Sequence, residues 1–383
     1  MSNIKELELH YDLFYGPQHP GVTGNMMYRV WAEGDTILKM ETNVGYLHRA
    51  FEKLMEKRSW MQNVPLVCRI CVPDPDVNEA AYSMAVEELM GWEIPERARY
   101  IRTIILELSR LASHLMTIGG IAASLGIYTA AQWGVGDRDY ILDIFEQITG
   151  ARVYHIYIWP GGVRWDLPDG IEKLILKTMD YLEKRAPLYD KLIFDNRVFV
   201  DRSVGVGVVP REKAIEWGVT GPNLRAAGYE IDVRKYEPYA AYEELEFEIP
   251  HYPELGKFSE VSTPGSDIYT RTVIRRMEMD QSISIIRQAI KKMPEGEVLL
   301  KHPNWLAWKV PEGYAFSRVE SSKGEYGYFV VSDGGLKPVR VHVRGPSYTH
   351  GITVAERIAP GMNIADFAPT MFSLDVCPPD IER

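Results

Sequence analysis

The chain has 383 residues, of which 46% are hydrophobic and 25% charged, enough apolar material for one large core or two smaller ones in a globular protein. Its formal net charge of -10 argues against nucleic acid or an anionic membrane surface as the main partner, because both repel an acidic protein. Three cysteines are too few for a disulfide framework, so we expect a reducing compartment and thiols that serve chemistry or packing.

The first residues, MSNIKELELHYDLF, lack the basic-then-apolar pattern of a secretion signal. No run approaches roughly 18 uninterrupted apolar residues, the length that crosses a bilayer. We therefore expect no membrane span in the chain and any membrane attachment through partner subunits. Polar and apolar residues alternate in short runs over 7–43, interrupted by the Gly/Pro-rich segment GPQHPGVTG at 16–24, which predicts a small sheet with a rigid loop.

Helical periodicity begins near residue 76. Pro95 is placed as a first helical residue, and the apolar residues after it recur at the spacing of a buried helical stripe. We expect one long core helix here, with an interruption at Gly119-Gly120. The stripe comprises Ile101, Ile104, Ile105, Leu108, Leu111, Ala112 and Leu115.

Three further long helices are predicted. One ends at Gly150, a second covers 169–195 with a kink at Pro187, and a third covers 271–293 and is ended by Pro294. Together with the first they form a bundle of four or more helices.

The remaining segments are shorter. Residues 201–265 have few clean periods and predict a loop-rich excursion packed on the bundle. The run YFVVSDGGLKPVRVHV at 328–343 has the alternation and the Asp-Gly-Gly turn of a β-hairpin, and 353–372 predicts a helix. The last residues are too proline-rich to be helical. We divide the chain into one integrated domain with four parts, 1–65, 66–200, 201–265 and 266–383.

All three cysteines fall in two segments at opposite ends of the chain, and each segment contains a Cys-x-x-Asp unit. Cys71 is followed by Asp74, and Cys377 is followed by Asp380. Brought together, the two units offer two thiolates and two carboxylates around one point. Cys68 and Cys71 also form a Cys-x-x-Cys, which by itself suggests a dithiol redox pair. The structural alternative is that free cysteines are small buried hydrophobes and that Asp beside Pro is turn chemistry.

These motifs resemble two related protein families. The triplets at 69–71 and 375–377 resemble the R-x-C-x-x-C and D-P-C-x-x-C motifs of nickel-iron hydrogenase large subunits, and longer stretches look like the homologous quinone-site subunit of complex I. The resemblance covers nearly the whole chain and implies an α+β fold, a central bundle of long helices with small antiparallel sheets at its N- and C-terminal ends. The stretches are GPQHPGVTG, VGYLHRAFEK, ILELSRLASHL, ILDIFEQITGARV, GVTGPNLRAAGYEIDVRKYEPY and YFVVSDGGLKPVRVHVRGPS.

The chain departs from the hydrogenase pattern at the bridging ligands. By the resemblance, Cys71 and Cys377 stand at the positions of terminal nickel ligands, while Asp74 and Asp380 stand where two bridging cysteines belong. An iron that carries cyanide and carbonyl needs soft thiolate bridges, and carboxylates favour harder ions. We therefore expect no nickel-iron centre and no metal bound by this chain.

The chain also departs from the quinone-site pattern. Thr23, Val72 and Ser124 stand at positions where that family uses a His, a Tyr and an Asp to bind and protonate the quinone head group. Their replacement removes hydrogen-bond anchors and proton donors, which argues against ordinary quinone reduction.

A third branch of the superfamily, the membrane-bound sulfane sulfur reductases of archaea, resembles the chain in its remodelled, nickel-free site. This resemblance implies a catalytic large subunit that reduces polysulfide in an ion-pumping complex, at a site formed by Cys68, Arg69, Cys71, Asp74, Cys377 and Asp380. A sulfane S–S bond exchanges readily with a thiolate. Because the chain has no cysteines to spare for a cluster, electrons from ferredoxin would arrive through a four-iron four-sulfur cluster in an adjacent small iron–sulfur subunit.

The same resemblance implies further partners: a ferredoxin-like cluster subunit, and antiporter-like and anchor subunits that hold the chain at the cytoplasmic face of the membrane. No nucleic-acid partner is expected.

Other polar residues are candidates of lower rank. His19, Thr23, Glu41 and Val72 are predicted to line the substrate cavity. Arg69 would lower a thiolate pKa and attract an anionic polysulfide, the alternative being an ordinary salt bridge. The remaining candidates are His48 and Arg49, as a weak proton relay, and His114, whose place on an apolar stripe favours a core histidine.

Two alternative functions remain open at the level of sequence. One is a divergent NADH/quinone oxidoreductase subunit of the complex I type. The other is a non-catalytic subunit that couples a cluster-bearing arm to a membrane arm.

Overall fold

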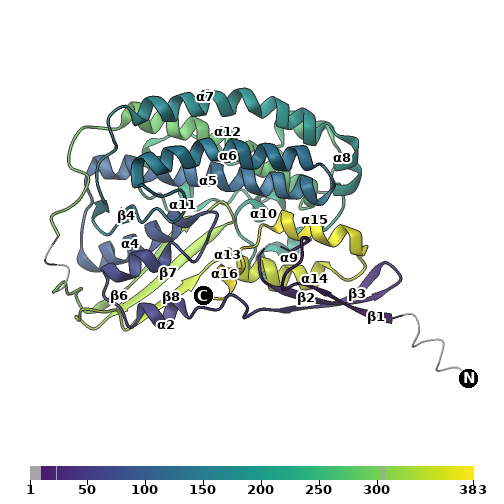
Figure 1. Ribbon diagram of the computed structural model, residues 1–383, viewed down its shortest axis with the longest axis horizontal. Helices are drawn as coiled ribbons and strands as arrows, with labels where there is room; N and C mark the ends of the chain where they lie inside the picture. Colours follow the sequence, from purple (N-terminus) through teal and green to yellow (C-terminus); the bar gives the residue numbers. More distant parts are fainter. Residues whose placement is uncertain (1–9, 23, 303, 305–306) are drawn as a thin grey trace, which may run out of the picture.

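The computed structural model describes residues 10–22, 24–302, 304 and 307–383. A layer of long helices lies over a lower layer, in which a three-stranded sheet and a second, projecting sheet lie at opposite ends (Figure 1). The α+β architecture predicted from the sequence is confirmed. The long helices are α5 (Glu96–Ser124), α6 (Tyr128–Thr149), α7 (Ile171–Tyr189) and α12 (Ile268–Lys292).

Helix α5 is the centre of the bundle and packs against both α6 and α12. The predicted stripe from Ile101 to Leu115 is buried. The predicted interruption at Gly119-Gly120 is wrong, because α5 continues without a break to Ser124. A Cβ on Gly119 would lie 3.2 Å from the backbone of Ala131 in α6, so glycine here permits close helix packing rather than a break.

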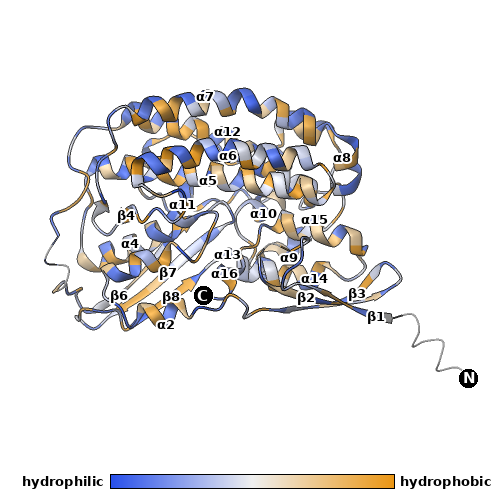
Figure 2. Cartoon of the chain, in the orientation of Figure 1, coloured by the Kyte–Doolittle hydropathy of each residue, from blue (hydrophilic) through white to orange (hydrophobic). Residues whose placement is uncertain are grey.

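By length and composition α5 could cross a membrane, but most of it is buried inside the protein, as in the core helix of a globular fold. Pro95 precedes the first helical residue rather than occupying it. Hydrophilic and hydrophobic residues alternate along α7, which covers the outer side of the bundle (Figure 2). This alternation is typical of a helix that buries one face.

The other helix ends lie within a few residues of the predicted positions. Gly150 follows α6 in the left-handed conformation, with φ of 77°. Helix α7 passes through Pro187 and continues from Asp190 to Phe194 as a π-helical turn. Helix α12 ends at Lys292, two residues before Pro294.

Two antiparallel three-stranded sheets flank the lower layer. The N-terminal sheet has the order β1-β2-β3, and the C-terminal sheet has the order β6-β7-β8 and packs on α4 (Pro75–Met90). The predicted hairpin is confirmed as β7 and β8, while β6 was not predicted. The strands are β1 (His10–Tyr15), β2 (Met27–Glu33), β3 (Thr36–Asn43), β4 (Ile158–Trp159), β5 (Gly162–Val163), β6 (Gly313–Glu320), β7 (Glu325–Ser332) and β8 (Arg340–Arg344).

Between α7 and α12 the chain forms only short helices, and two of them carry an arginine whose side chain is buried against the bundle. Arg225 pairs with Glu278 at 2.5 Å and Glu320 at 2.8 Å, and Arg234 pairs with Glu107 at 3.0 Å. All five side chains are buried, so the bundle interior contains an ion-pair cluster. The short helices are α8 (Arg197–Ser203), α9 (Arg211–Glu216), α10 (Gly221–Ala226) and α11 (Val233–Tyr236), with 3-10 turns at Tyr242–Glu244 and Gly256–Glu260.

The C-terminal region corrects two predictions. The helix expected over 353–372 is divided, because the chain leaves the helical path after Ile358, passes through a turn that contains Gly361 with φ of 86°, and resumes in α15 (Ile364–Leu374). The tail was expected to be non-helical, but α16 (Pro378–Ile381) is a short helix, because proline fits the first helical positions. The other short elements are α2 (Phe51–Met55), a 3-10 turn at Met61–Asn63, α3 (Val64–Val67), α13 (Pro346–Tyr348), a π-helical turn at Thr349–Val354 and α14 (Ala355–Ile358).

Candidate active site

The candidate site lies where the loop between α3 and α4 meets the turn that follows α15. Cys71 lies in that loop and Cys377 in that turn, and both side chains are buried. Both thiols are reduced, and the Cys71 thiol hydrogen-bonds the Cys377 sulfur. Helices α13 and α16 and the C-terminus lie side by side at the middle of the lower layer (Figure 1). The structure thus brings together one cysteine from each Cys-x-x-Asp unit.

The two thiols differ in acidity. The hydrogen bond from Cys71, followed by the charge of Lys323, lowers the pKa of Cys377. Burial, followed by the proximity of Cys377, raises the pKa of Cys71 well above its ordinary value. Cys377 is therefore the more acidic thiol of the pair, and Cys71 is the thiol that donates to it.

Lys323 supplies the positive charge of the site. It lies in the turn between β6 and β7, is fully buried, and donates to Asp375 Oδ1 at 2.7 Å. Burial by itself lowers the pKa of Lys323, but Asp375 and the two cysteines outweigh burial and raise it. Sequence reasoning missed this residue because β6 was not predicted. The signal was available in Ser-Ser-Lys-Gly, a turn that places a lysine between two strands.

The two aspartates of the Cys-x-x-Asp units hold backbone amides. Asp74 Oδ2 accepts from the amide of Ser322 at 2.8 Å, and Asp380 Oδ2 accepts from the amide of Ser347 at 2.9 Å. Burial raises the pKa of both carboxyls. A Cβ on Gly345 would overlap Asp380 Oδ1, so the fold requires glycine there. Asp74 and Asp380 thereby fix the two cysteine loops to neighbouring turns.

Tyr326 also contacts the cysteines and was not predicted. It is fully buried on β7, and burial, followed by the charge of Asp380, raises its pKa well above the ordinary value. Its phenol therefore stays protonated beside the thiol pair.

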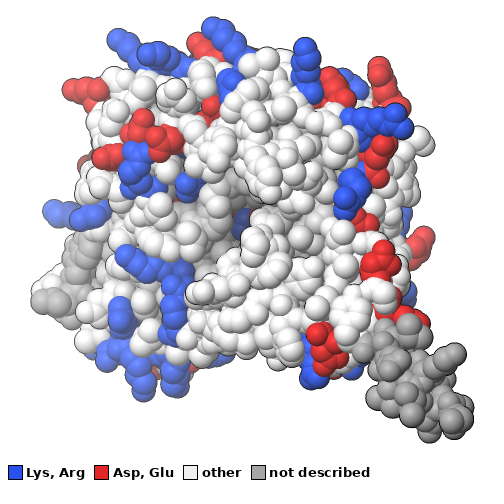
Figure 3. Space-filling view, turned by 45° about the vertical axis from the view of Figure 1, so that its right-hand side comes forward, with Lys and Arg blue, Asp and Glu red and all other residues white. Residues whose placement is uncertain are grey.

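An apolar cavity of about 450 Å³ opens onto Cys377. Val72, Pro73, Met116 and Phe372 contribute apolar surface to its lining, and the lining also includes Lys323. One face of the molecule has a hollow near its middle, bordered mainly by uncharged side chains, with lysine and arginine side chains gathered to one side (Figure 3). Such a cavity favours a ligand that is apolar along its length and negatively charged at its end.

The residues do not fit the nickel-iron centre that the hydrogenase resemblance implies. Two thiols meet here, and the carboxylates at 74 and 380 are used as acceptors for backbone amides. Across the described part of the chain, no three His, Cys, Asp or Glu side chains converge as a metal site. Oxygen donors do not replace bridging thiolates for iron that carries cyanide and carbonyl.

Two predicted site residues lie beside the thiol pair rather than in the apolar cavity. Cys68 donates to the carbonyl of Pro65, and burial, followed by the charge of Glu79, raises its pKa. Arg69 hydrogen-bonds Cys68 Sγ at 3.4 Å and stacks over Tyr154 at 5.0 Å. Neither lines the cavity at Cys377.

The remaining candidates lie mostly at the periphery. Glu41 is exposed and pairs with Lys39 at 2.6 Å. His19 accepts from the amide of Gly21, and Thr23 lies outside the described residues. The other positions are His48, which contacts the carbonyl of Glu382 at 3.0 Å, Arg49, which donates to the carbonyl of Arg69 at 2.9 Å, and Ser124, which donates to the carbonyl of Ile121.

His114 lies close to the site but on its inner side. It is fully buried and pairs with Glu278 at 2.8 Å, and burial lowers its pKa despite that partner. The place of His114 on an apolar stripe favoured a core histidine over a proton relay, and the structure contains a buried, paired histidine.

Comparison with known proteins places these features in context. The family model for the respiratory-chain NADH dehydrogenase 49 kDa subunit matches residues 124–309 and 304–383. A subunit of the NADH-quinone oxidoreductase of Thermosipho melanesiensis is 48% identical over 97% of this chain and 99% of that protein. The corresponding subunit of the NADH-quinone oxidoreductase of Desulforamulus reducens is 41% identical over 94% of this chain and 95% of that protein.

One solved structure is similar along the whole chain. It is a chain of the membrane-bound sulfane sulfur reductase, an archaeal respiratory membrane complex. The TM-score is 0.92 at 46% identity, and the match covers 98% of this chain and 99% of that one.

Proposed function

Since the chain belongs to the family of the respiratory-chain NADH dehydrogenase 49 kDa subunit, we propose that it is the catalytic large subunit of a membrane-bound complex that reduces sulfane sulfur. At the coarser level the chain is an oxidoreductase subunit of a membrane respiratory complex. One observation carries the finer proposal. Cys377, whose pKa is lowered by the hydrogen bond from the Cys71 thiol and by the charge of the buried Lys323, lines an apolar cavity.

The reaction uses the different acidities of the two thiols. The Cys377 thiolate attacks a sulfane sulfur of a polysulfide, forms a Cys377 persulfide, and releases a polysulfide one sulfur shorter. The Cys71 thiol then exchanges with the persulfide, which gives a Cys71–Cys377 disulfide and one hydrosulfide ion carrying the Cys71 proton. Two electrons and one proton restore the thiol and the thiolate. The net reaction converts a polysulfide, two electrons and one proton into the shorter polysulfide and hydrosulfide.

The cavity fits this substrate class. The middle of a sulfur chain is apolar and polarizable, which matches the surface contributed by Val72, Met116 and Phe372. Its charged end matches Lys323, whose charge is shared with Asp375 but faces both sulfurs. Two of the side chains that the resemblance assigns to quinone binding offer no donor to this cavity, because Val72 is apolar and Ser124 donates to the carbonyl of Ile121.

Electrons for the disulfide would come from a partner, because this chain has no cysteines beyond the three discussed. We propose a small iron–sulfur subunit whose four-iron four-sulfur cluster lies beside the Cys68–Cys71 loop, with ferredoxin as the donor and a ferredoxin-like subunit between them. Antiporter-like and anchor subunits would hold the assembly at the cytoplasmic face of the membrane and move ions.

Quinone reduction is the second candidate function, since the relatives at 48% and 41% identity are named as subunits of NADH-quinone oxidoreductases. The two candidates differ in their dependence on the thiols. Sulfur exchange requires Cys377, whereas hydrogen bonding to a quinone does not.

The assembled complex, driven by reduced viologen, tests both candidates in parallel assays with polysulfide and with a soluble quinone. We expect polysulfide turnover in the wild type, its loss in Cys377→Ser, and a large decrease in Cys71→Ser. Cys68→Ser decides whether the third cysteine takes part. Wild-type polysulfide turnover that persists in Cys377→Ser, or quinone turnover with no polysulfide turnover, would refute the proposal.

A further inference from the structure

The hairpin of β6 and β7 brings two polar side chains to the thiol pair. Lys323 lies in its turn, and Tyr326 lies near the start of β7. Tyr326 is on the same face of the strand as Tyr328, which donates to Asn78 of α4 at 2.8 Å, and both phenols are buried. One hairpin thus supplies a positive charge and a hydroxyl to the cysteines, and the proposed reaction uses only the charge.

The Tyr326 hydroxyl is directed to two groups that come from opposite ends of the chain. One is the carboxyl of Asp380 in α16, and the other is the sulfur of Cys71 in the loop before α4. Asp380 Oδ2 accepts from the amide of Ser347 at 2.9 Å, whereas Oδ1 accepts from no backbone amide of the described residues. The hydroxyl therefore connects a buried carboxyl with a buried thiol.

The proposed reaction requires a proton at Cys71. When two electrons reduce the Cys71–Cys377 disulfide, two sulfur anions form, and the Cys71 sulfur has to take up one proton. Burial raises the pKa of Cys71 well above its ordinary value, so its thiolate is a strong base with its sulfur removed from bulk water. A group in contact with this sulfur is needed to supply the proton.

A neutral hydroxyl can pass on a proton without being ionised, because it donates on one side while it accepts on the other. Burial, followed by the charge of Asp380, raises the pKa of Tyr326, so the two transfers have to occur together and no free phenolate forms. Burial also raises the pKa of Asp380, although Ser347 and Arg383 oppose it. A buried carboxyl of this kind is suited to hold the proton behind the hydroxyl.

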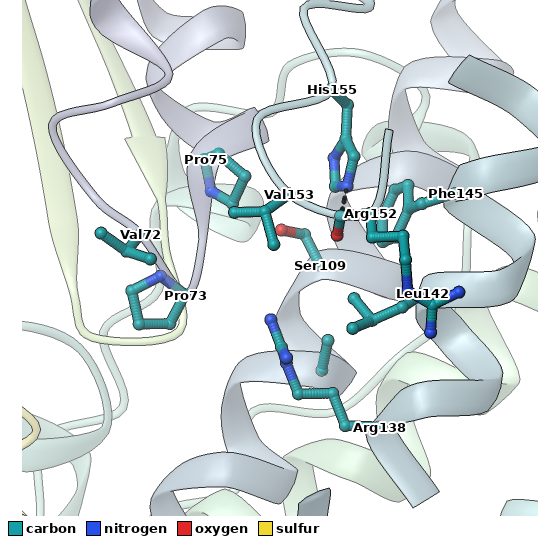
Figure 4. A pocket seen from close by; sticks show the side chains of 11 residues that line it. Val72, Pro73, Pro75, Ser109, Arg138, Leu142, Phe145, Arg152, Val153 and His155 are labelled. Atoms are coloured by element: carbon teal, nitrogen blue, oxygen red, sulfur yellow. Dashed lines mark hydrogen bonds between the residues drawn. The ribbon is translucent and has the colours of Figure 1, made fainter. Parts of the chain in front are cut away.

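Asp74, the other buried carboxyl beside Cys71, is held as an acceptor. Ser109 on α5 is directed to it, and Figure 4 shows this serine opposite the two prolines that flank Asp74 in the chain. Two buried cations, Arg110 and Lys323, favour its ionised form. Asp74 is therefore less suited than Asp380 to give up a proton.

Lys323 is unsuited as the donor for a different reason. Its ammonium pairs with Asp375 at 2.7 Å, and this pair, together with the cysteines, raises the pKa of Lys323 in spite of burial. Loss of the proton would leave the buried Asp375 carboxylate without its nearest cation. Lys323 supplies a charge, and the proton has to come from elsewhere.

We propose that Tyr326 relays the proton that Cys71 takes up when the Cys71–Cys377 disulfide is reduced, with Asp380 as the donor behind it. As two electrons break the S–S bond, the Tyr326 hydroxyl donates its proton to the Cys71 sulfur and accepts the proton of Asp380, which becomes a carboxylate. Asp380 regains a proton from solvent before the next cycle. The inference rests on the proposed function for the place of the disulfide in turnover.

The test follows the disulfide itself in the assembled complex. The complex is oxidised with diamide, the Cys71–Cys377 disulfide is verified by peptide mass spectrometry, and its reduction by reduced methyl viologen is timed by stopped flow. Tyr326→Phe should slow the reduction at least about tenfold, because a positioned proton donor contributes roughly 100-fold or more. Tyr328→Phe is the matched control and should leave the rate unchanged, because this buried phenol is directed to Asn78.

Two further measurements separate the relay from a structural role. Alkylation of Cys377 by iodoacetamide in the reduced complex should be the same in Tyr326→Phe as in the wild type, because that step consumes no proton. Asp380→Asn keeps an acceptor for the Ser347 amide but cannot hold an acidic proton, so it should slow disulfide reduction as Tyr326→Phe does. The double variant should be no slower than either single variant, because the two residues act as one unit.

The outcomes distinguish the relay from the proposed function. Slower disulfide reduction in Tyr326→Phe and Asp380→Asn would support the relay even in a complex that does not turn over polysulfide, a result that would refute the proposed function alone. An unchanged reduction rate in Tyr326→Phe, effects that multiply in the double variant, or a wild-type complex in which diamide forms no Cys71–Cys377 disulfide would overturn the inference.

Discussion

Replacement of Lys323 by Met tests the electrostatic basis of the proposed chemistry. The side chain keeps its approximate volume but loses the buried positive charge that faces both cysteines and pairs with Asp375 at 2.7 Å. A cation within about 4–6 Å shifts the pKa of a neighbouring anion by roughly 1–3 units. Without it, the pKa of Cys377 rises, and the thiolate fraction at neutral pH falls about tenfold or more.

The expected result is a displaced pH profile rather than a dead enzyme. Polysulfide reduction by Lys323→Met should be lower at neutral pH and should recover as the pH is raised, because a higher pKa moves the acidic limb of the profile upward. The rate of Cys377 alkylation by iodoacetamide should show the same displacement without any turnover. An acidic limb that stays in place in both assays would refute the assignment of Lys323.

Stability must be separated from chemistry in this variant. Asp375 is buried and would keep only Arg275, at 3.6 Å, so unfolding should become about 3 kcal/mol easier. The double variant Lys323→Met with Asp375→Asn removes both charges and should recover stability without recovering the pH profile. Lys213→Met is the matched control, because Lys213 is an exposed lysine paired with Glu216.

Two further predictions concern the fold around the site. Gly345→Ala should lower the unfolding temperature and polysulfide turnover together, because its Cβ would overlap Asp380 Oδ1. Gly136→Ala is the control, because a Cβ there meets nothing within 4 Å, and it should be neutral or stabilising by up to about 1 kcal/mol. Equal effects of the two substitutions in thermal unfolding would contradict the packing argument. Asp232→Asn should cost about 2 kcal/mol at pH 7, because Arg234 and Arg225 outweigh burial and hold the pKa of Asp232 at about 2, below its ordinary 3.8. This contribution to stability is present above pH 4 and is lost as the pH falls toward 2. The free energies of unfolding of the wild type and the variant, measured with denaturant, should therefore converge in acid. A difference that stays constant with pH would contradict the prediction.

The elements that the sequence predicted well are those whose apolar spacing is long and regular. Helix α5 buries the residues of its predicted stripe, and the β7–β8 hairpin follows from alternation on both sides of an Asp-Gly-Gly turn. The errors occur at glycines and prolines, because each of these residue types can serve more than one structural role. Gly119 permits close helix packing, Gly361 lies in the turn between two helices, and Pro378 begins a helix.

The site was harder to predict because it depends on contacts between distant segments. The Cys-x-x-Asp repetition drew attention to Cys71 and Cys377, whose thiols the structure places in contact, while the roles of the six predicted site residues stay predictions. Lys323 was missed for a physical reason. A lysine or arginine in a sequence has the same appearance whether it is solvated, paired or left without a counter-charge, and only the fold distinguishes these cases.

The ion-pair cluster inside the bundle has a mechanical consequence. Arg225 and Arg234 reach carboxylates on three separate elements, α5, α12 and β6, and any sliding or rotation of one helix would leave a buried charge without its partner. The upper layer therefore behaves as a stiff frame that resists shear. We therefore expect any movement that accompanies the proposed substrate entry and product exit in the loops beneath it, among them the segment of Val72 and Pro73 that lines the apolar cavity.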